Sequence, residues 1–318
     1  MAGVTNTVFR TICKEFGADV LTTEFVSAEG ILHRNERTRR YLEFTAMERP
    51  LGIQLFGAEP GHLAEAARAV IDWVAPDFLD LNFGCPVNKV VCKNGGSSLL
   101  RDCPLLERVA RAVVSAADPV PVTAKIRIGW DASSINATTT ARILEEAGVR
   151  RIAVHGRTKA QGYSGVADWE EIARVAAAVT VPVIGNGDID TAETALRRLR
   201  ESGVSGLMIG RAAMQDPAIF ADIRSALRGG PVPSRTPEER WKLALRHCAG
   251  EIRWRGEEGA AMRSMRSRLM AYARGMPGGA RLREHLAHVS SLAELEDVVA
   301  AYIGSSAAMA SITRSESR

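Results

Sequence analysis

Six short apolar runs in this 318-residue sequence end in polar side chains or glycine, and these ends could together form one pocket. A single buried amide or imidazole is usually a core polar group with partners close by. Six such groups, one to a run, are hard to explain as packing and predict a functional site. The groups are Gln54, Asn82, Lys125 with Arg127, His155 with Arg157, Asn186-Gly187-Asp188, and Gly210-Arg211.

Cys85 is the residue whose setting most favours catalysis. It lies in Asn82-Phe83-Gly84-Cys85-Pro86, directly after an apolar run. A thiol with an ordinary pKa of about 8.5 stays protonated at neutral pH and can serve as a general acid. A nucleophilic role would require a lowered pKa, and the residues leave both roles open. The other four cysteines have no comparable setting: Cys13, Cys92, Cys103 and Cys248.

Two glycines follow the last two apolar runs, and their position indicates a phosphate-bearing ligand. Gly187 and Gly210 come where parallel barrels often bind phosphate, because glycine lets backbone N–H groups approach the phosphate closely. Arg211 can add positive charge. No Gly-x-Gly-x-x-Gly follows a first strand, so a Rossmann-type dinucleotide site is not indicated.

The elements that must position these residues alternate between strand and helix. Between residues 20 and 210, β-branched apolar runs are separated by helical stretches, which implies parallel pairing and right-handed crossovers. We therefore expect an α/β fold, a (β/α)8 TIM barrel over residues 1–230. Asp168 and Asp190, each three residues before a glutamate, are expected to cap helices. The runs are 20–23, 51–55, 78–82, 122–128, 151–155, 181–184 and 206–209.

Seven runs are one fewer than a closed barrel of this kind requires. The segment Ala2-Gly3-Val4-Thr5 has the character of a strand-end loop. We therefore expect the first strand to belong immediately before Met1, so that it is missing or truncated in this sequence. Two sheet edges would then be left unpaired.

After Gly229-Gly230 the pattern becomes helical only. Thr236-Pro237-Glu238-Glu239 has a cap residue, a proline at the first helical position and a glutamate three residues after the cap. We expect a small all-α domain over residues 235–303. Gly304 is expected to end its last helix, and 305–318 to be a disordered tail.

Composition and charge limit the function classes. The chain is 46% hydrophobic and 25% charged, and it has no apolar run of the roughly 18 residues that a membrane span needs. From its first residues we expect no secretory leader. Its five scattered cysteines form no Cys-x-x-Cys pair, so neither a zinc site nor a disulfide framework is expected. We expect a cytoplasmic protein with no metal and no obligate protein partner. Eight arginines against two glutamates in 253–283 account for much of the net charge of +4 and predict a surface for a polyanion.

Several stretches of the chain resemble one family. "AGVTNTVFR", "LDLNFGCPVNKV", "KIRIGW", "VHGRTKAQGYSGVADW", "VIGNGDID" and "MIGRAAMQDPAIF" are similar, in order and spacing, to the tRNA-dihydrouridine synthases, particularly the bacterial B-type branch. The resemblance runs from residue 2 to about 225 and continues more weakly to about 285. It implies bound FMN, NADPH (or NADH) as reductant, tRNA as the partner, hydride transfer to a uracil and proton donation by Cys85.

The resemblance also assigns residues position by position. Those that match the family's substrate contacts are Asn82, Arg127 and Arg157, with Arg266 and Arg268 expected on an RNA surface of the helical domain. Those that match contacts of FMN are Met1, Ala2, Gln54, Lys125, His155, Asn186, Gly187, Asp188, Gly210 and Arg211.

The chain departs from the family pattern in two further stretches. The stretch Arg266–Tyr272 lacks the lysine and the tryptophan that are usual there, and 92–95 differs from the usual basic loop. Two other hypotheses stay open: a flavin barrel that reduces a small molecule, as dihydroorotate dehydrogenases and ene-reductases do, and a tRNA-binding protein without catalysis.

Overall fold

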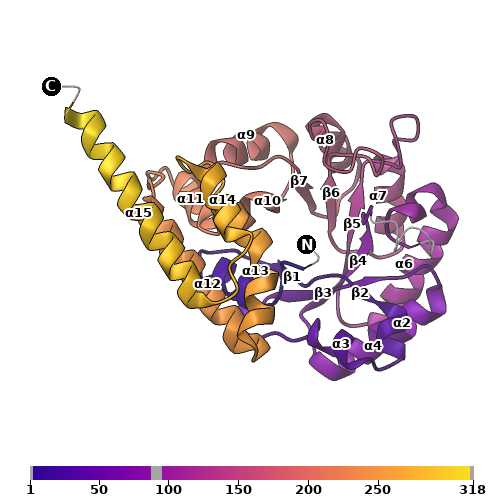
Figure 1. The fold of residues 1–318 in the computed structure, drawn as a ribbon. Helices are drawn as coiled ribbons and strands as arrows, with labels where there is room; N and C mark the ends of the chain where they lie inside the picture. The colour runs from indigo at the N-terminus through magenta and orange to yellow at the C-terminus, as the bar shows by residue number, and fades with distance from the viewer. Residues whose placement is uncertain (1–2, 87–94, 316–318) are drawn as a thin grey trace.

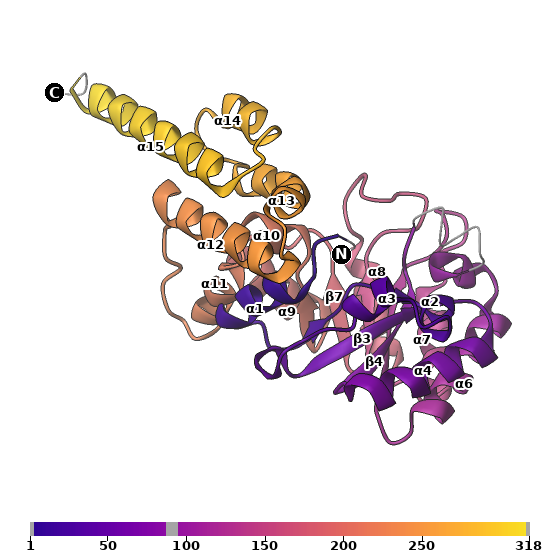
Figure 2. The same ribbon diagram turned by 60° about the horizontal axis from the view of Figure 1, so that its bottom comes forward.

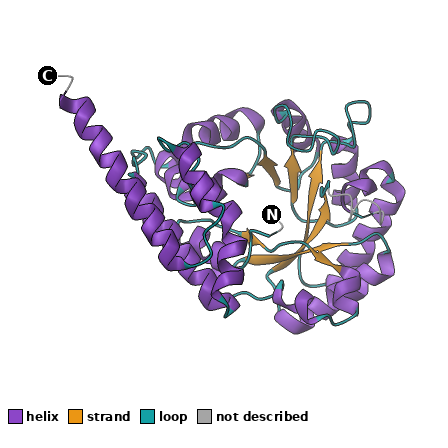
Figure 3. Ribbon diagram, in the orientation of Figure 1, coloured by secondary structure: helices purple, strands orange, loops and turns teal. Residues whose placement is uncertain are grey.

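The sheet is parallel and curled, and its strand order follows the chain. The computed structural model describes residues 3–86 and 95–315. Each strand pairs in parallel with the next, in the order β1-β3-β4-β5-β6-β7-β8. Figures 1 and 3 show the strands as an arc with helices around its outer side. The strands are β1 (Leu21–Thr22), β2 (Val26–Ser27), β3 (Leu51–Phe56), β4 (Phe78–Phe83), β5 (Val122–Arg127), β6 (Ile152–His155), β7 (Val183–Asn186) and β8 (Gly206–Met208).

All seven expected runs form strands, and the eighth strand of the sheet, β2, was not predicted from the sequence. β1 and β2 both pair with β3, Leu21 opposite Leu51 and Val26 opposite Leu55, so they act as one interrupted strand at one edge. β8 lies at the other edge. Within the described residues no ladder joins β8 to β1, and the sheet is an open TIM-barrel-like arc rather than a closed barrel.

Helices cover the outer face of the sheet and share one apolar core with it. Strand residues such as Ile53, Leu79 and Val154 are fully buried in the same cluster as the helix residues Val70 and Val109. The helices that follow β1–β4 are α2 (Ala28–Leu32), α3 (Glu36–Arg40), η1 (Ala46–Glu48), α4 (Pro60–Val74), η2 (Gly96–Arg101) and α6 (Cys103–Ala117); those that follow β5–β8 are α7 (Ala137–Glu146), α8 (Trp169–Ala178), α9 (Ala192–Ser202), α10 (Arg211–Gln215) and α11 (Ile219–Leu227).

Helix caps explain several of these boundaries. Asp168 accepts a hydrogen bond from the Glu171 amide (2.9 Å) and caps α8, as predicted. The prediction for Asp190 is wrong, because the cap of α9 is Thr191, whose hydroxyl accepts from the Thr194 amide at 3.0 Å.

A second apolar cluster lies in the helical region, by which we mean residues 235–303. Trp241, Met262 and Leu269 are fully buried there, separate from the cluster under the sheet. The region packs beside α1 (Thr7–Glu15), as Figure 2 shows. Its helices are α12 (Pro237–Arg255), α13 (Glu258–Tyr272), α14 (Gly279–Leu286) and α15 (Leu292–Ser315), which extends beyond it.

The two ends of the helical region differ in how well the sequence predicted them. The capping box at Thr236 and Glu239 is present at the start of α12. The predicted helix end at Gly304 is wrong, because α15 continues to Ser315 and residues 305–315 are helical rather than an irregular tail. One glycine in a helix costs only about 1 kcal/mol relative to alanine, and the alanine-rich stretch after it favours helix. In the part of the chain that is described, no helix is both long and apolar enough to cross a membrane.

Candidate active site

The predicted polar residues meet at one edge of the sheet. Gln54, Asn82, Lys125, His155 and Asn186 lie in or next to the last residues of β3 to β7. Register places them in order around the arc: Asn82 opposite Lys125, and His155 opposite Asn186. The carboxyl ends of parallel strands share one edge, which is where barrels of this kind build their sites.

A chain of amide hydrogen bonds positions Cys85. The Gln54 side chain donates to a carboxylate oxygen of Asp80 (2.6 Å), and the Asn82 amide donates to Gln54 Oε1 (2.7 Å). Asn82 Oδ1 in turn accepts from the backbone amides of Gly84 (3.1 Å) and Cys85 (2.9 Å). The carbonyl of Cys85 accepts from the Ser97 hydroxyl at 2.8 Å. Both sides of the cysteine are therefore held, and the residue is 7% exposed.

Arg127 connects the loop of Cys85 to the loop after β6. Its Nε donates to the Gly84 carbonyl (2.9 Å), and its Nη1 donates to the carbonyls of Thr158 (2.8 Å) and Gly162 (2.9 Å). The residue is 2% exposed. These contacts give Arg127 an internal structural role, and its predicted contact with a substrate stays a prediction.

Arg157 keeps one donor without a protein acceptor. Its Nε donates to the Ser164 carbonyl (3.0 Å), and its Nη2 donates to the Gly165 carbonyl (2.7 Å) and to Asp188 (2.8 Å). Among the described residues its buried Nη1 has no hydrogen-bond partner. A buried donor without a hydrogen bond costs about 1–3 kcal/mol of stability, so a ligand that places an acceptor at this position would be favoured.

Asp188 joins the loop after β7 to the loop after β6 and to the start of α10. Besides Arg157, its carboxylate accepts from the Ala167 amide (2.8 Å) and from Arg211 Nη2 (3.0 Å). Burial alone would raise the pKa of Asp188, but these hydrogen bonds and the two guanidinium charges lower it below its ordinary value. Asp188 is therefore an anion that orients the guanidinium groups of Arg157 and Arg211.

Gly187 lies in backbone geometry that only glycine adopts readily. Its φ is +132°, and a Cβ there would lie 2.5 Å from Cβ of Ala167 and 3.3 Å from Cδ2 of His155. Its carbonyl accepts from Trp169 Nε1 at 3.0 Å. The next strand end is fixed through Asn186, whose amide donates to the Met208 carbonyl (2.7 Å).

Two titratable groups in the site have strongly shifted pKa values. Burial, reinforced by the charge of Arg127, lowers the pKa of Lys125 to about 7, although Asp80 opposes the shift. Burial and the charges of Lys125 and the nearby arginines lower the pKa of His155 to about 2. At neutral pH the site therefore contains a neutral imidazole and an amine that is half protonated. Such shifts concentrate at functional sites.

The chain is similar to known proteins of one family. A family model described as dihydrouridine synthase (Dus) matches residues 1–307. The tRNA-dihydrouridine synthase B of Pseudomonas aeruginosa is 40% identical over 284 residues, which cover 89% of this chain and 85% of that protein. A probable tRNA-dihydrouridine synthase 1 of Synechocystis is 38% identical over 301 residues, 94% of this chain and 83% of that protein.

The chain belongs to the dihydrouridine synthase family.

Solved structures of lower identity share the fold alone. The structure of TcOYE with pHBA has a TM-score of 0.52 at 12% identity, over 73% of this chain and 86% of that one. A variant of NCR from Zymomonas mobilis has a TM-score of 0.52 at 14% identity, over 75% and 87%. The resemblance to dihydrouridine synthases is confirmed, and so is the expected α/β fold, as an open TIM-barrel-like arc followed by a helical region.

Tyr163 is a residue of the site that sequence reasoning missed. The residue is 58% exposed, and its ring lies 5.0 Å from the guanidinium of Arg211, 5.8 Å from that of Arg127 and 6.4 Å from the ring of His155. Within the family motif "QGYSG" it is the aromatic residue, and that was the available signal. An exposed ring beside cations can stack on a planar ligand.

The remaining predicted residues lie elsewhere. Met1 and Ala2 are outside the described residues. Arg266, on α13, donates to the carbonyls of Val289 and His288 (both 3.0 Å) and is half-buried. Arg268 is 2% exposed and bonded within the protein, which gives it an internal structural role, and its predicted contact with RNA stays a prediction.

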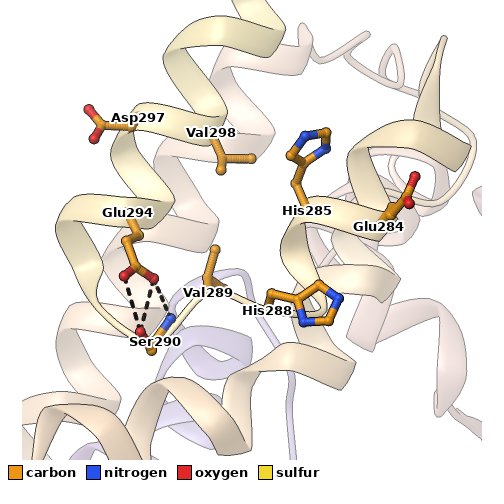
Figure 4. A pocket seen from close by; sticks show the side chains of 8 residues that line it. All are labelled: Glu284, His285, His288, Val289, Ser290, Glu294, Asp297 and Val298. Carbon is orange, nitrogen blue, oxygen red and sulfur yellow. Dashed lines mark hydrogen bonds between the residues drawn. The ribbon is translucent and has the colours of Figure 1, made fainter.

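One groove in the described chain lies away from the strand ends. It is between α14 and α15, has a volume of about 790 Å³ and includes three carboxylates, those of Glu284, Glu294 and Asp297. Figure 4 shows that its histidines, His285 and His288, do not converge on the carboxylates, and no group of metal-ligating side chains that could hold an ion occurs in the described residues. Negative charge makes this groove unsuitable for a phosphate backbone.

Proposed function

We propose that this chain is a tRNA-dihydrouridine synthase that reduces the C5–C6 bond of specific uridines in tRNA. The observation that carries the proposal is the arrangement of Cys85, which Asn82 holds by two backbone amides at the edge of a cluster of strand-end donors. Membership of the dihydrouridine synthase family and the names of its relatives support the same conclusion.

The residues present fit a flavin with a phosphate group, and we propose FMN. The site offers donors in excess of protein acceptors: Lys125 Nζ reaches only the Ile126 carbonyl, at 3.3 Å, and Arg157 Nη1 has no partner among the described residues. The Lys125 amine is suited to the flavin's polar N1–C2 side. The backbone at Gly187 and Gly210 and the Arg211 side chain suit the phosphate. A bound flavin supplies the hydride, for which we propose NADPH as the source.

Cys85 then acts as the proton donor to C5 of the uracil. The thiol lies on a loop whose backbone is held by hydrogen bonds from Ser97 and Arg127 and to Asn82. Fixed placement of an acid is what general acid catalysis requires, and it is typically worth roughly 10²–10⁴-fold in rate. His155, neutral at physiological pH, does not compete as an acid.

The tRNA substrate has to present its uridine extruded from the stack. A base inside a folded tRNA cannot reach a site at the strand ends, so it must be turned out of its stack. Tyr163, exposed beside Arg211, can stack on a base or a neighbouring nucleotide. The arginines of 253–283 that remain exposed are suited to phosphate contacts: Arg253, Arg255, Arg263, Arg274 and Arg281.

The test is nucleoside mass spectrometry on unmodified tRNA incubated with the protein, FMN and NADPH. Formation of dihydrouridine, lost with Cys85→Ala although flavin reduction by NADPH persists, is the expected result. If turnover survives in Cys85→Ala, the proton-donor role is wrong. If the protein binds flavin but reduces free uracil or an enone as well as it reduces tRNA, a small-molecule reductase is the better conclusion. Salt-sensitive tRNA binding without flavin would indicate a protein that only binds tRNA.

A further inference from the structure

A buried ion pair lies where the helical region meets the first residues of the chain. Glu251 on α12 and Arg268 on α13 are 0% and 2% exposed, and their Oε1 and Nη1 atoms are 2.7 Å apart. The other carboxylate oxygen of Glu251 accepts from Arg255 at 3.1 Å. The active-site chemistry proposed above uses neither residue.

Both members of the pair also bind the N-terminal segment, by which we mean Gly3–Asn6. Arg268 Nη2 donates to the carbonyls of Gly3 (2.6 Å) and Val4 (3.2 Å). The Asn6 side-chain amide donates to Glu251 Oε1, the oxygen that also receives Arg268. Asn6 Oδ1 meanwhile caps α1 by accepting from the Phe9 amide at 3.1 Å. These contacts join the pair to a segment that is far away in the chain.

The N-terminal segment lies at the same edge of the sheet as the candidate active site. The Gly3 amide donates to Glu24 Oε2 at 2.8 Å, and Glu24 follows β1 closely and is buried. The neighbouring Thr23 receives the Gln54 backbone amide on its hydroxyl (3.1 Å), which places this strand end beside the first residue of the hydrogen-bond chain to Cys85. Figures 1 and 2 show the first described part of the chain, ahead of α1, passing between α13 and the sheet.

Stability alone does not explain such a pair. Removing two charges from water is costly, and a buried ion pair is often no more stabilising than apolar residues of the same volume. The pair does orient the N-terminal segment, because each of its charged groups forms hydrogen bonds of defined geometry with groups on that segment. The hydrogen bonds from Arg268 to the carbonyls of Gly3 and Val4 fix the path of the backbone in a stretch that has no sheet partner among the described residues.

We propose that Glu251 and Arg268 are positioning residues for the flavin site, holding the N-terminal segment at the strand ends so that it can border the bound cofactor. The inference rests on the proposed function, because it assigns the pair to the FMN of that same site. It also makes the helical region part of the support of the cofactor pocket, in addition to its role toward tRNA. Loosening the pair then weakens flavin binding from a distance.

The experiment compares full-length Arg268→Met, Glu251→Gln and the double variant with Arg246→Ala. Arg246 is the matched control: it pairs with Glu15 (2.6 Å) across the same contact between α12 and α1 and is half exposed. The measurements are the FMN dissociation constant from flavin fluorescence, hydrogen exchange of the peptide that includes Gly3–Asn6, and the urea midpoint. The double variant replaces both charges, so that neither is left buried and alone.

Arg268→Met and the double variant are expected to exchange faster at Gly3–Asn6 and to bind FMN more weakly, by about tenfold if the segment is in place only about a tenth of the time. Arg246→Ala is expected to match the wild type in both. Unchanged FMN affinity in a folded double variant would overturn the inference, as would equal losses in Arg246→Ala. If the wild type binds no FMN, the proposed function itself fails. Faster exchange confined to the segment would then show that the pair positions the segment, but not for a flavin, and the inference would fall as well.

Discussion

Lys125 should make flavin binding depend on pH within the physiological range. Its pKa of about 7 means that about half of the molecules carry the ammonium form at pH 7, about a tenth at pH 8 and about a hundredth at pH 9. The ammonium form is the one that donates a charge-assisted hydrogen bond to the flavin carbonyl. Since protonation is lost as pH rises, affinity must fall in the alkaline direction.

The magnitude follows from the competent fraction. When only the ammonium form binds, the apparent dissociation constant is the intrinsic value divided by that fraction, so it rises about fiftyfold from pH 7 to pH 9. The second pKa of a phosphate ester is about 6, so the FMN phosphate keeps its charge over this range and does not contribute. Fluorescence titration of FMN at half-unit steps of pH measures the slope directly.

Two variants separate Lys125 from other titrating groups. Lys125→Met is expected to bind FMN weakly and with no slope between pH 7 and 9. Lys125→Arg, whose guanidinium stays protonated, is expected to lose the slope while keeping a positive charge. A wild-type profile that is flat over this range, or a slope that persists in Lys125→Met, would refute the reasoning.

Three further outcomes are expected. The His155 imidazole should show no titration by NMR between pH 5 and 8, since its pKa is held at about 2; a midpoint in that range would contradict the neutral assignment. Asn82→Ala removes the acceptor for two backbone amides on the Cys85 loop and should lower tRNA turnover more than flavin reduction by NADPH, which single-turnover kinetics can separate. Gly187→Ala should cost more than the roughly 1–2 kcal/mol of ordinary left-handed strain, because its Cβ would also meet Ala167 at 2.5 Å. Gly203→Ala is its control, because Gly203 also has a positive φ but no atom lies within 4 Å of an added Cβ. Equal urea midpoints for the two variants would contradict the steric argument.

The strands and most of the site could be predicted because their signals are local. Apolar runs mark β3 to β8, and the polar residue or glycine at the end of each run is placed at the same sheet edge by parallel pairing. β2 was not predicted because a strand of two residues, Val26 and Ser27, is too short to show a periodic pattern. Asp190 was predicted as a cap from its spacing to Glu193 alone. The adjacent Thr191 can cap as well, and only the backbone geometry decides which of the two residues does so.

The predictions for arginines depend on contacts that the sequence does not reveal. Arg268 has its carboxylate partner 17 residues away on another helix, and its carbonyl partners are 265 and 264 residues away. Nothing in the local pattern distinguishes it from Arg263, which is exposed on the same helix. A sequence shows which residues are charged. Whether a charged side chain is buried within the protein or exposed to a ligand is decided only when distant elements pack together.

Burial therefore changes what the positive charge of the chain means. Arg127, Arg157 and Arg268 are each 2% exposed, and each donates to backbone carbonyls of another part of the chain. A guanidinium can do this because its five donors lie in a rigid plane, so that one side chain fixes several segments at once. These arginines use their donors to fix the site and its surroundings, and only the exposed ones are left for a phosphate backbone. The electrostatic attraction of tRNA should accordingly be weaker than a count of the arginines in 253–283 implies, and correspondingly less sensitive to salt.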